Sequence, residues 1–417
     1  MKIAFTTLGC KLNYAETSTY ERGFRERGLE VVPWNEPADI YLVNTCAVTE
    51  TAEKKSRNLI RRAHKTAPQA AIVVTGCYAE LRKEKLLEIE GVARVFGAGE
   101  KKSVVPETLK LSGIAPRGEE LPAAEGMLPA YSSGERTRSF LKVQDGCDNF
   151  CAYCTVPYAR GRSRNIPICE VVRQAREIAA KGFREIVLTG VNTGDFGRTT
   201  GESFLDLLKA LNEVEGIERY RISSIEPNLI TEETVDWIAS GTKFQPHFHI
   251  PLQSGSDTLL KRVGRRYDTA LFSSRIDYIR ARMNRPGEPA VFFGIDIIVG
   301  LPGETEELFL ETFRFLKERI RPAFIHVFPY SRRPGTRAAT WSDQVQDSVK
   351  TERVARLEEL CRELHEDFAA SQKGLRGTVL WESSVKDGRM SGYTGNYLRV
   401  EKPYDPSSVN QLEEVIL

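Results

Sequence analysis

The sequence predicts an α/β protein with an N-terminal parallel α/β domain, a central partial (β/α)6 barrel and a small C-terminal all-β barrel. Three observations support this fold class. Short apolar runs alternate with helical stretches over most of the first 370 residues, which is typical of parallel sheets. Gly and Pro interrupt the alternation between Gly113 and Gly134. After Gly374, short strand patterns follow one another, separated by turns rich in Gly, Asp, Asn and Ser.

The first domain is expected to span residues 1–112, and a linker at 113–135 then crosses the surface. Helices are expected near 14–27, 50–66 and 80–89. Near-continuous apolar runs predict buried parallel strands at 3–6, 30–32, 40–43, 72–75 and 94–96.

The second domain is expected at 136–372 and the third at 373–417. Six further β/α units are enough for an open, incomplete barrel, and a last amphipathic helix at about 345–370 closes it. The barrel strands are expected at 139–143, 185–189, 220–223, 247–252, 291–299 and 323–328. The C-terminal strands are expected at 377–380, 397–401 and 413–417.

The charge and hydropathy of the chain exclude some functions. The 417 residues include 59 basic and 57 acidic side chains, so the net charge of +2 by itself predicts no nucleic-acid partner. No stretch approaches the run of roughly 18 apolar residues that a membrane span needs. Thr6 and Thr7 interrupt the N-terminal apolar run and no cleavage site follows, so this run is interpreted as a strand and not as a signal peptide. The sequence predicts a soluble, cytoplasmic protein without a membrane partner.

Three of the eight cysteines form a C-x3-C-x2-C loop, Cys147, Cys151 and Cys154, just after the first barrel strand. In a long chain without a signal peptide, such spacing favours metal ligands over disulfides. Three thiolates so close in sequence can converge on one inorganic cluster and leave one iron open to a ligand. A structural zinc site would need a fourth ligand, and no other Cys or His lies between Tyr131 and Cys169. The position fits an active site, because barrels build theirs at the carboxyl ends of their strands.

This loop resembles the signature of radical S-adenosylmethionine (SAM) enzymes, including the aromatic Tyr153 directly before the third cysteine. The resemblance implies a [4Fe–4S] cluster whose open iron binds the amino and carboxylate groups of SAM. It also implies that one electron cleaves the sulfonium and yields a 5′-deoxyadenosyl radical.

Cys10, Cys46 and Cys77 each follow a predicted parallel strand, in IAFTTLGC, IYLVNTC and IVVTGC. Parallel strands present the same end to the same edge, with neighbours about 4.8 Å apart. Three thiolates at that edge can hold a second cluster, again with one open iron. The competing interpretation is three small core residues. Cys169 and Cys361 lie in predicted helices without a partner cysteine and are interpreted as small buried hydrophobes.

Two three-cysteine clusters on two α/β domains, followed by a small β domain, resemble the methylthiotransferases over essentially the whole chain. The resemblance implies that the N-terminal cluster donates sulfur, that one SAM methylates a cluster-bound sulfur, and that a second SAM supplies the radical that activates a C–H bond. The matching motifs are LGCKLN at 8–13, NTCAVT at 44–49, TGCYAE at 75–80, the radical loop, HIPLQSGS at 249–256 and DIIVGLPGET at 296–305.

Polar residues follow several barrel strands, where they would line one mouth suited to ribose hydroxyls and a methionyl carboxylate. Asn192, Ser224, Glu226 and Gln253 are expected to bind SAM as a set, although ordinary turn chemistry fits each one equally well. Gly190, like the counterpart glycines of radical SAM enzymes, would permit close backbone approach.

Basic residues gather near both cysteine groups. One stripe, spaced by four residues, lies on the expected helix at 50–66, a pair follows the sixth barrel strand, and a further cluster lies at 261–266. Positive patches around a mouth fit a polyanion, and solvated surface is the alternative. The residues expected to contact RNA are Arg57, Arg61, Lys65, Arg332 and Arg333.

The C-terminal appendage resembles the small RNA-binding barrel called TRAM. Gly374, Gly377, Tyr393 and Tyr397 fit its turns and a stacking surface. The appendage ends sooner than expected for that domain, either because a terminal strand is absent or because the chain is truncated.

The methylthiotransferases have three substrate branches with different openings. TLGCKLN, together with NTCAVTETAEKKSRN and DGCDNFCAYCTVPYARG, resembles the branch that acts on N6-threonylcarbamoyladenosine beside the anticodon, at tRNA position 37. The isopentenyladenosine branch typically opens with YGCQMN, and the branch acting on an aspartate of a small-subunit ribosomal protein opens with SLGCPKN. The resemblance implies a 2-methylthio product, and Arg332 or Arg333 are candidates by position for binding the threonylcarbamoyl carboxylate.

The partners implied are tRNA and an electron donor such as flavodoxin or ferredoxin, and the chain is expected to be a monomer. Two rivals come from other classes. One is a non-catalytic iron–sulfur protein that binds RNA and senses redox state, which cleavage of SAM to 5′-deoxyadenosine would eliminate. The other is a radical enzyme with an electron-transferring second cluster and a small-molecule substrate, which failure to bind tRNA in low salt would favour.

Overall fold

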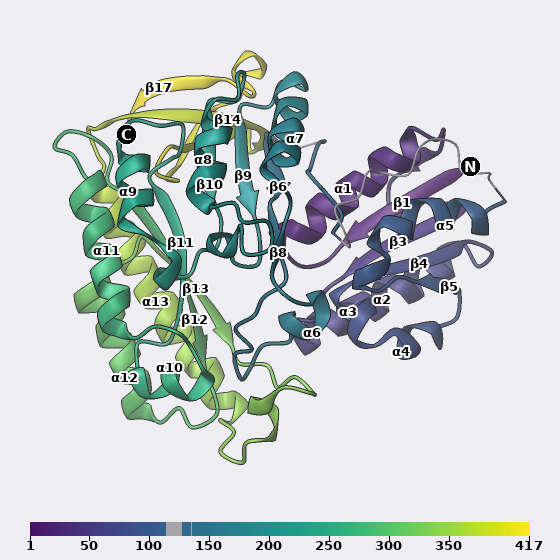
Figure 1. Cartoon of the computed structure of the whole chain (residues 1–417), viewed down its shortest axis with the longest axis horizontal. Helices are drawn as coiled ribbons and strands as arrows, with labels where there is room; N and C mark the ends of the chain where they lie inside the picture. Colours follow the sequence, from purple (N-terminus) through teal and green to yellow (C-terminus); the bar gives the residue numbers. More distant parts are fainter. Residues whose placement is uncertain (114–126, 135) are drawn as a thin grey trace.

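The structure is a computed structural model that describes residues 1–113, 127–134 and 136–417. Most of the predicted linker at 113–135 therefore lies outside the described residues. Within the described ranges, no helix is long and apolar enough to cross a membrane. The elements form a parallel sheet, a partial barrel and an antiparallel C-terminal sheet (Figure 1). The predicted fold class is confirmed.

The N-terminal sheet is parallel and has the strand order β2-β1-β3-β4-β5. Every residue of β3 is buried, and its alternate side chains belong to two separate apolar clusters. Helices α1 and α5 pack on one face, and α2 to α4 pack on the other. The elements are β1 (Lys2–Thr7), α1 (Lys11–Arg25), β2 (Glu30–Val32), β3 (Ile40–Thr45), α2 (Glu50–Thr66), β4 (Ala71–Gly76), α3 (Cys77–Leu81), α4 (Lys83–Leu87), β5 (Val92–Val95) and α5 (Val104–Leu111).

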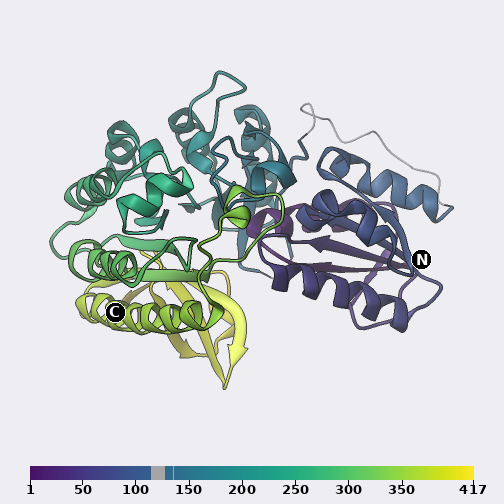
Figure 2. The ribbon, with the colours of Figure 1, turned by 90° about the horizontal axis from the view of Figure 1, so that it is seen from below.

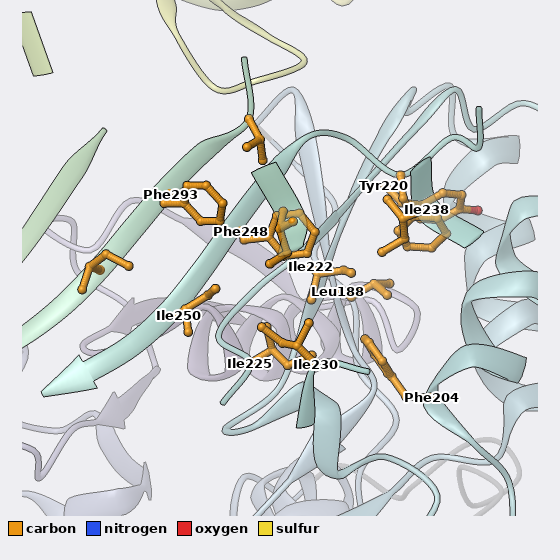
Figure 3. Packing of buried hydrophobic residues seen from close by; sticks show 14 of the residues in the cluster. Leu188, Phe204, Tyr220, Ile222, Ile225, Ile230, Ile238, Phe248, Ile250 and Phe293 are labelled. Atoms are coloured by element: carbon orange, nitrogen blue, oxygen red, sulfur yellow. The ribbon is translucent and has the colours of Figure 1, made fainter. Parts of the chain in front are cut away.

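The barrel has six parallel strands in two three-stranded ladders, β6-β9-β10 and β11-β12-β13. A parallel bridge from Tyr220 to Phe244, just before β11, connects the two ladders. Apolar side chains from four neighbouring strands fill the space between strands and helices (Figure 3). The strands are β6 (Arg138–Lys142), β9 (Glu185–Thr189), β10 (Arg219–Ile222), β11 (His247–Gln253), β12 (Phe292–Val299) and β13 (Phe324–Pro329).

Helices cover the outside of the barrel (Figures 1 and 2). A short hairpin, β7 (Gln144–Asp145) with β8 (Arg164–Asn165), brackets the loop at 147–154. The helices are α6 (Val156–Arg160), α7 (Ile168–Ala180), α8 (Phe204–Asn212), α9 (Glu232–Ala239), α10 (Asp257–Val263), α11 (Thr269–Met283), α12 (Glu306–Arg314) and α13 (Asp347–Ser371).

The C-terminal sheet has four antiparallel strands in the order β16-β15-β14-β17, one more than predicted. The missed strand is β15, which pairs with β14 through a turn at Asp387 and Gly388, both at positive φ. An Asp-Gly pair between strands is a hairpin signal, so the sequence did contain the information. The strands are β14 (Arg376–Lys386), β15 (Arg389–Thr394), β16 (Arg399–Pro403) and β17 (Leu412–Ile416).

Five buried charged groups join the N-terminal sheet to the barrel. The carboxylate of Glu16 on α1 accepts hydrogen bonds from Lys101 Nζ at 2.8 Å and Lys142 Nζ at 2.7 Å. Asp145 pairs with Lys142 and Arg160, each at 2.8 Å. Buried charges of this kind are stable only when each finds its partners. We call these five residues the buried ion cluster.

Candidate active site

The loop at 147–154 is attached to the barrel by main-chain hydrogen bonds. Ala152 N donates to Val263 O at 2.8 Å, at the end of α10. Gly146 has φ +75°, and a Cβ there would lie 2.0 Å from the carbonyl oxygen of Arg162. Glycine therefore allows the turn that leads from β7 into the loop.

The three thiols of this loop influence one another. Burial raises the pKa of Cys147 to about 11 and that of Cys154 to about 12, and the neighbouring Cys151 adds to both shifts. The guanidinium of Arg265 donates to Cys151 Sγ at 3.2 Å. Thiols with such raised pKa values are protonated near neutral pH, and a metal that binds them displaces these protons.

Two residues that were expected to bind SAM, Asn192 and Glu226, lie beside this loop. Glu226 accepts a hydrogen bond from Asn149 Nδ2 at 2.7 Å and forms an ion pair with Arg265 at 2.7 Å. Asn192 Oδ1 accepts a hydrogen bond from Glu226 N at 3.2 Å. These contacts brace the cysteine loop, and direct contact of either side chain with SAM stays a prediction.

The other expected SAM residues also lie on or after the carboxyl ends of barrel strands. A Cβ at Gly190 would lie 2.9 Å from Gln144 Oε1, so this glycine allows a close approach within the protein. Ser224 and Gly190 line the cavity described below. Gln253 is buried with φ +72° at the end of β11, and Tyr153 packs on an apolar cluster beside the loop.

Cys10, Cys46 and Cys77 lie at the carboxyl ends of β1, β3 and β4, which are neighbours in the sheet. Cys46 and Cys77 directly follow their strands, and Cys10 stands immediately before α1. A Cβ on Gly9 would lie 3.2 Å from Cys46 Sγ, so glycine allows the turn before Cys10 to approach Cys46. The structure thus brings together three cysteines that are far apart in the sequence.

Arg160, a cation from the helix that follows the other cysteine loop, exerts a lowering effect on the pKa of Cys46 and of Cys77. Burial raises the pKa of Cys46 to about 11 and also raises the pKa of Cys77, and Arg160 opposes both shifts. Arg160 is the last residue of α6, which follows the loop at 147–154, and its side chain is held by Asp145. The buried ion cluster therefore places a positive charge of the radical loop beside the N-terminal triad.

The spacing of the sulfur atoms distinguishes a cluster from a single ion. Among the described residues, only His249, Asp296 and His326 form a group of three His, Cys, Asp or Glu side chains whose ligand atoms all lie within 4.8 Å of one another. Neither cysteine triad is that compact, whereas ligands on one zinc ion are about 3.8 Å apart. The two triads therefore do not form a compact single-ion site among the described residues.

A cavity of about 910 Å³ lies between the N-terminal sheet edge and the barrel interior. Cys10 and Lys11 line it from the N-terminal side, and strand residues such as Thr189 and Ser223 line it from the barrel. Aromatic rings form much of its wall, and flat apolar rings suit a planar base. They are Tyr14, Phe140, Phe292, Phe324, Phe328, Tyr393 and Tyr397.

Four of the five histidines also line the cavity, and two of them are kept neutral by their surroundings. Burial lowers the pKa of His247 well below its usual value and also lowers that of His326. His249 Nε2 lies 2.6 Å from Asp296 Oδ1, so this ring is hydrogen-bonded. The fourth is His365. His247 and His326 therefore add no fixed positive charge to the cavity, whereas its Lys and Arg side chains do.

The predicted basic stripe lies on α2. Arg61 and Lys65 are exposed, whereas Arg57 is half-buried and donates to Tyr78 Oη at 2.9 Å. The structure therefore leaves two of these three side chains available to a partner, and RNA contact by any of them stays a prediction.

Of the two arginines after the sixth barrel strand, one is also exposed and the other buried. Arg332 is exposed, and Arg333 is buried in an ion pair with Glu53 of α2. Glu50 N also donates to Ser331 Oγ at 3.3 Å, so this loop packs against the start of α2. The loop after β13 therefore contacts the first turn of α2, while Arg61 and Lys65 lie in the later turns of that helix.

Sequence reasoning missed the side chains that support the cysteine loops. Arg265 was grouped with the basic cluster at 261–266, a patch suited to a polyanion or to solvent, yet it holds Cys151 and Glu226. Arg160 was not singled out at all. Cys361 is buried as predicted, but Cys169 is exposed on the first turn of α7, so that prediction was wrong. The available signal was the presence of arginines near the cysteine motifs in the sequence. Their spacing alone does not show which arginine contacts a cysteine loop.

Comparison with known proteins agrees with this site. Two family models match the chain, Uncharacterized protein family UPF0004 at residues 2–97 and the Radical SAM superfamily at residues 141–316. Threonylcarbamoyladenosine tRNA methylthiotransferase MtaB of Bacillus subtilis is 40% identical, over 95% of this chain and 89% of that protein. MtaB of Aquifex aeolicus is 36% identical, over 96% and 97%. The tRNA-2-methylthio-N(6)-dimethylallyladenosine synthase of Geobacter metallireducens is 33% identical, over 98% and 94%.

Among solved structures, the fold is similar to the radical SAM methyltransferase TsrM from Kitasatospora setae with tryptophan and a SAM analogue bound. The TM-score is 0.59 at 15% identity, over 81% of this chain and 75% of that chain. The barrel and these matches define a radical SAM enzyme. More narrowly, the chain belongs to the family of tRNA methylthiotransferases. The expected cofactors, two [4Fe–4S] clusters and SAM, are confirmed by this membership.

Proposed function

We propose that this chain converts N6-threonylcarbamoyladenosine at tRNA position 37, next to the anticodon, to its 2-methylthio derivative. The observation that carries the proposal is the likeness of nearly the whole chain to proteins named for this activity. The cavity supports it, because Cys10 meets an aromatic, basic lining there. Such a lining suits an adenine base with an anionic substituent.

The two cysteine triads have separate roles in this proposal. Cys147, Cys151 and Cys154 would hold the cluster beside which SAM binds, and Cys10, Cys46 and Cys77 would hold the auxiliary cluster. When bound, the two clusters supply the reducing electron and the sulfur of the reaction. The residues proposed to hold SAM are Tyr153, Gly190, Asn192, Ser224, Glu226 and Gln253.

The protein's own contribution is to fix these parts relative to one another. The buried ion cluster connects α1, which follows Cys10, to α6, which follows Cys154. A displacement of one loop by about 1 Å can cost two orders of magnitude in rate, so rigid coupling of both loops serves the reaction. The cavity beside Cys10 would enclose the reacting base and limit its contact with water.

We place tRNA on the surface that α2 forms with the loop after β13. Arg332 presents an exposed charge in this loop, which packs against the start of α2, and Arg61 and Lys65 present exposed charges farther along the same helix. In this assignment Arg57 and Arg333 act indirectly, by holding Tyr78 and Glu53. Phosphate contacts of this kind make binding strongly dependent on salt.

The remaining partners are also proposals. A radical SAM enzyme needs one-electron reduction, so we propose flavodoxin or ferredoxin as the donor. We propose that the enzyme acts as a monomer in the cytoplasm, where its tRNA substrate is found.

The test is mass spectrometry of nucleosides from tRNA of a strain that lacks this gene, with and without the gene restored. The proposal predicts that 2-methylthio-N6-threonylcarbamoyladenosine vanishes in the deletion strain and returns on complementation. Loss of a different methylthio nucleoside would overturn the substrate and keep the enzyme class. An unchanged nucleoside profile would contradict the activity on tRNA.

A further inference from the structure

The cavity beside Cys10 carries a one-sided charge. Its lining includes five Lys and Arg side chains and no Asp or Glu among the described residues. A surface with one sign of charge and apolar walls strengthens the attraction of an ion of the opposite sign. The five basic residues are Lys11, Arg136, Arg138, Arg221 and Arg399.

The arginines of this lining already have partners. Arg138 pairs with Glu382 at 2.9 Å, and Arg221 pairs with Glu185 at 2.7 Å. The other two are also occupied: Arg399 is paired with Glu401 at 2.8 Å, and Arg136 lies over the Tyr14 ring at 4.7 Å.

Lys11 differs from these arginines. Its ammonium forms no hydrogen bond or ion pair with any residue in the described part of the chain. Of the charged groups that act on Lys11, Arg138 and Arg221 are cations and Asp296 is a carboxylate. Asp296 is itself hydrogen-bonded to His249. A half-buried cation without a counter-charge is the group that gains most from a bound anion.

The position of Lys11 links this cation to the reacting centre. Lys11 is the first residue of α1 and directly follows Cys10, so its side chain extends from the edge that carries the N-terminal triad into the cavity. An anion bound there would lie within one side-chain length of the sulfur-donating edge. A carboxylate on the N6 substituent of an adenine meets this requirement, because the base itself would occupy the aromatic part of the cavity.

We propose that Lys11 binds the carboxylate of the threonylcarbamoyl substituent and thereby selects adenosines with an anionic N6 group. This inference rests on the proposed function. It replaces Arg332 and Arg333 as carboxylate ligands, since neither of them lines the cavity. Arg332 Nε donates to Ala339 O at 2.7 Å, and Arg333 is paired with Glu53.

The test combines a change in the protein with a matched change in the substrate. Wild type, Lys11→Gln and Lys11→Arg are assayed as loaded enzymes on tRNA that carries N6-threonylcarbamoyladenosine, and on the same tRNA with that carboxylate converted to a methyl ester. Lys209→Gln changes an exposed lysine on α8 that does not line the cavity, and it makes the same charge change elsewhere. Iron and sulfide contents are measured for each variant.

We expect Lys11→Gln to raise KM for the natural substrate on the order of 10- to 100-fold, with a smaller change in kcat, because a charge-assisted hydrogen bond is lost. Lys11→Arg recovers part of this loss, and Lys209→Gln causes none. The ester lowers kcat/KM in wild type by a similar factor and causes no further loss in Lys11→Gln, since both changes remove the same contact. Cluster content and the affinity for tRNA without the modification stay at wild-type levels.

Each contrary result has its own meaning. Additive losses from the ester and from Lys11→Gln would overturn the inference, and so would an unchanged KM. If Lys11→Gln fails to assemble its clusters, the ester comparison in wild type decides: equal kcat/KM for both substrates overturns the inference, and a loss supports it. If wild type does not modify the natural substrate, the proposed function fails first, and that outcome is distinguishable from the others.

Discussion

The two cysteine triads are built in opposite ways. Cys147, Cys151 and Cys154 belong to one short loop, and the local sequence determines their spacing. Cys10, Cys46 and Cys77 come from three strands and meet only when β1, β3 and β4 lie side by side. The first triad is therefore a motif, and the second is a consequence of tertiary structure.

This difference explains why contacts between the N-terminal sheet and the barrel matter for the N-terminal triad. The three cysteines of the N-terminal triad keep their position relative to the barrel only if the sheet edge stays packed against it. The buried ion cluster provides that contact. The loop triad is supported from within the barrel itself, by Arg265 and Glu226. Changes to the loop should act locally, whereas changes to the sheet edge should act through the fold.

The largest effect is expected from removing each triad as a whole. Replacing Cys147, Cys151 and Cys154 by Ala, or Cys10, Cys46 and Cys77 by Ala, should each remove half of the iron bound by the anaerobically reconstituted protein. The other half should remain, because the proposal gives each triad its own cluster. Iron and acid-labile sulfide analysis checks this. Complete loss of iron from either variant would show that the two sites do not form independently.

The next largest effect concerns the contact between the regions. Glu16→Gln leaves buried cations without one of their two carboxylates and should lower the free energy of unfolding by about 3–5 kcal/mol at neutral pH. The charges of Lys101, Lys142 and Arg160 lower the pKa of Glu16 from 4.5 to about 2 against the opposing effect of burial. Denaturant unfolding of the cluster-free proteins measures the difference.

The same variant makes a prediction about pH. Because the folded-state pKa of Glu16 is depressed, its contribution is fully present above about pH 4.5 and is lost as the pH falls toward 2. The gap in unfolding free energy between wild type and Glu16→Gln should therefore stay constant from pH 7 to 5 and narrow below pH 4.5. A gap that widens on acidification would contradict this assignment.

A smaller effect is expected at the sheet edge itself. Gly76 has φ +101°, and a Cβ there would lie 2.3 Å from the carbonyl oxygen of Thr45, immediately before Cys46. Gly76→Ala should cost about 2–4 kcal/mol from backbone strain and overpacking. Gly241→Ala is the matched control, since its φ is +92° but nothing lies within 4 Å of a Cβ.

The control should cost only about 1–2 kcal/mol, from the backbone alone. Thermal unfolding gives both values, and iron analysis should show a loss for Gly76→Ala only. Equal destabilisation by the two variants would mean that the close packing of the edge contributes nothing.

The smallest effect is expected on the outer surface. Arg61→Gln combined with Lys65→Gln should weaken tRNA binding by roughly tenfold at 0.15 M salt and reduce the slope of log affinity against log salt by about 1.5. The folded state should be unaffected, because both side chains are exposed. Fluorescence titration at several salt concentrations, with Lys209→Gln as the control, measures this. An unchanged slope would place the tRNA elsewhere.

Sequence patterns were sufficient for the parts of the fold that depend on local periodicity. All six barrel strands lie within one or two residues of the predicted positions, because buried parallel strands are continuous apolar runs. The strand β15 was missed because its sequence, RMSGYT, contains Gly392 and only one long apolar side chain. Gly392 is needed there, since a Cβ would lie 2.5 Å from Val379 Cγ1.

Long-range pairing was beyond the sequence patterns. The cysteines could be recognised, but the side chains that support them, such as Arg160 and Arg265, reach their partners across many residues. Lys11 lies within LGCKLN, where the sequence pattern alone assigns it no role. The three branch openings differ directly after the first cysteine, where they have Lys, Gln or Pro, and this difference was the available signal for a role in substrate choice.

The central claim is that the two triads do different chemistry in one reaction. The most direct measurement determines 5′-deoxyadenosine and methylthio nucleoside in the same reaction mixture, for wild type, Cys154→Ala and Cys46→Ala with reductant, SAM and substrate tRNA. We predict that Cys154→Ala forms neither product, and that Cys46→Ala forms 5′-deoxyadenosine but no methylthio nucleoside. Equal 5′-deoxyadenosine from wild type and Cys154→Ala, or methylthio product from Cys46→Ala, would contradict the account.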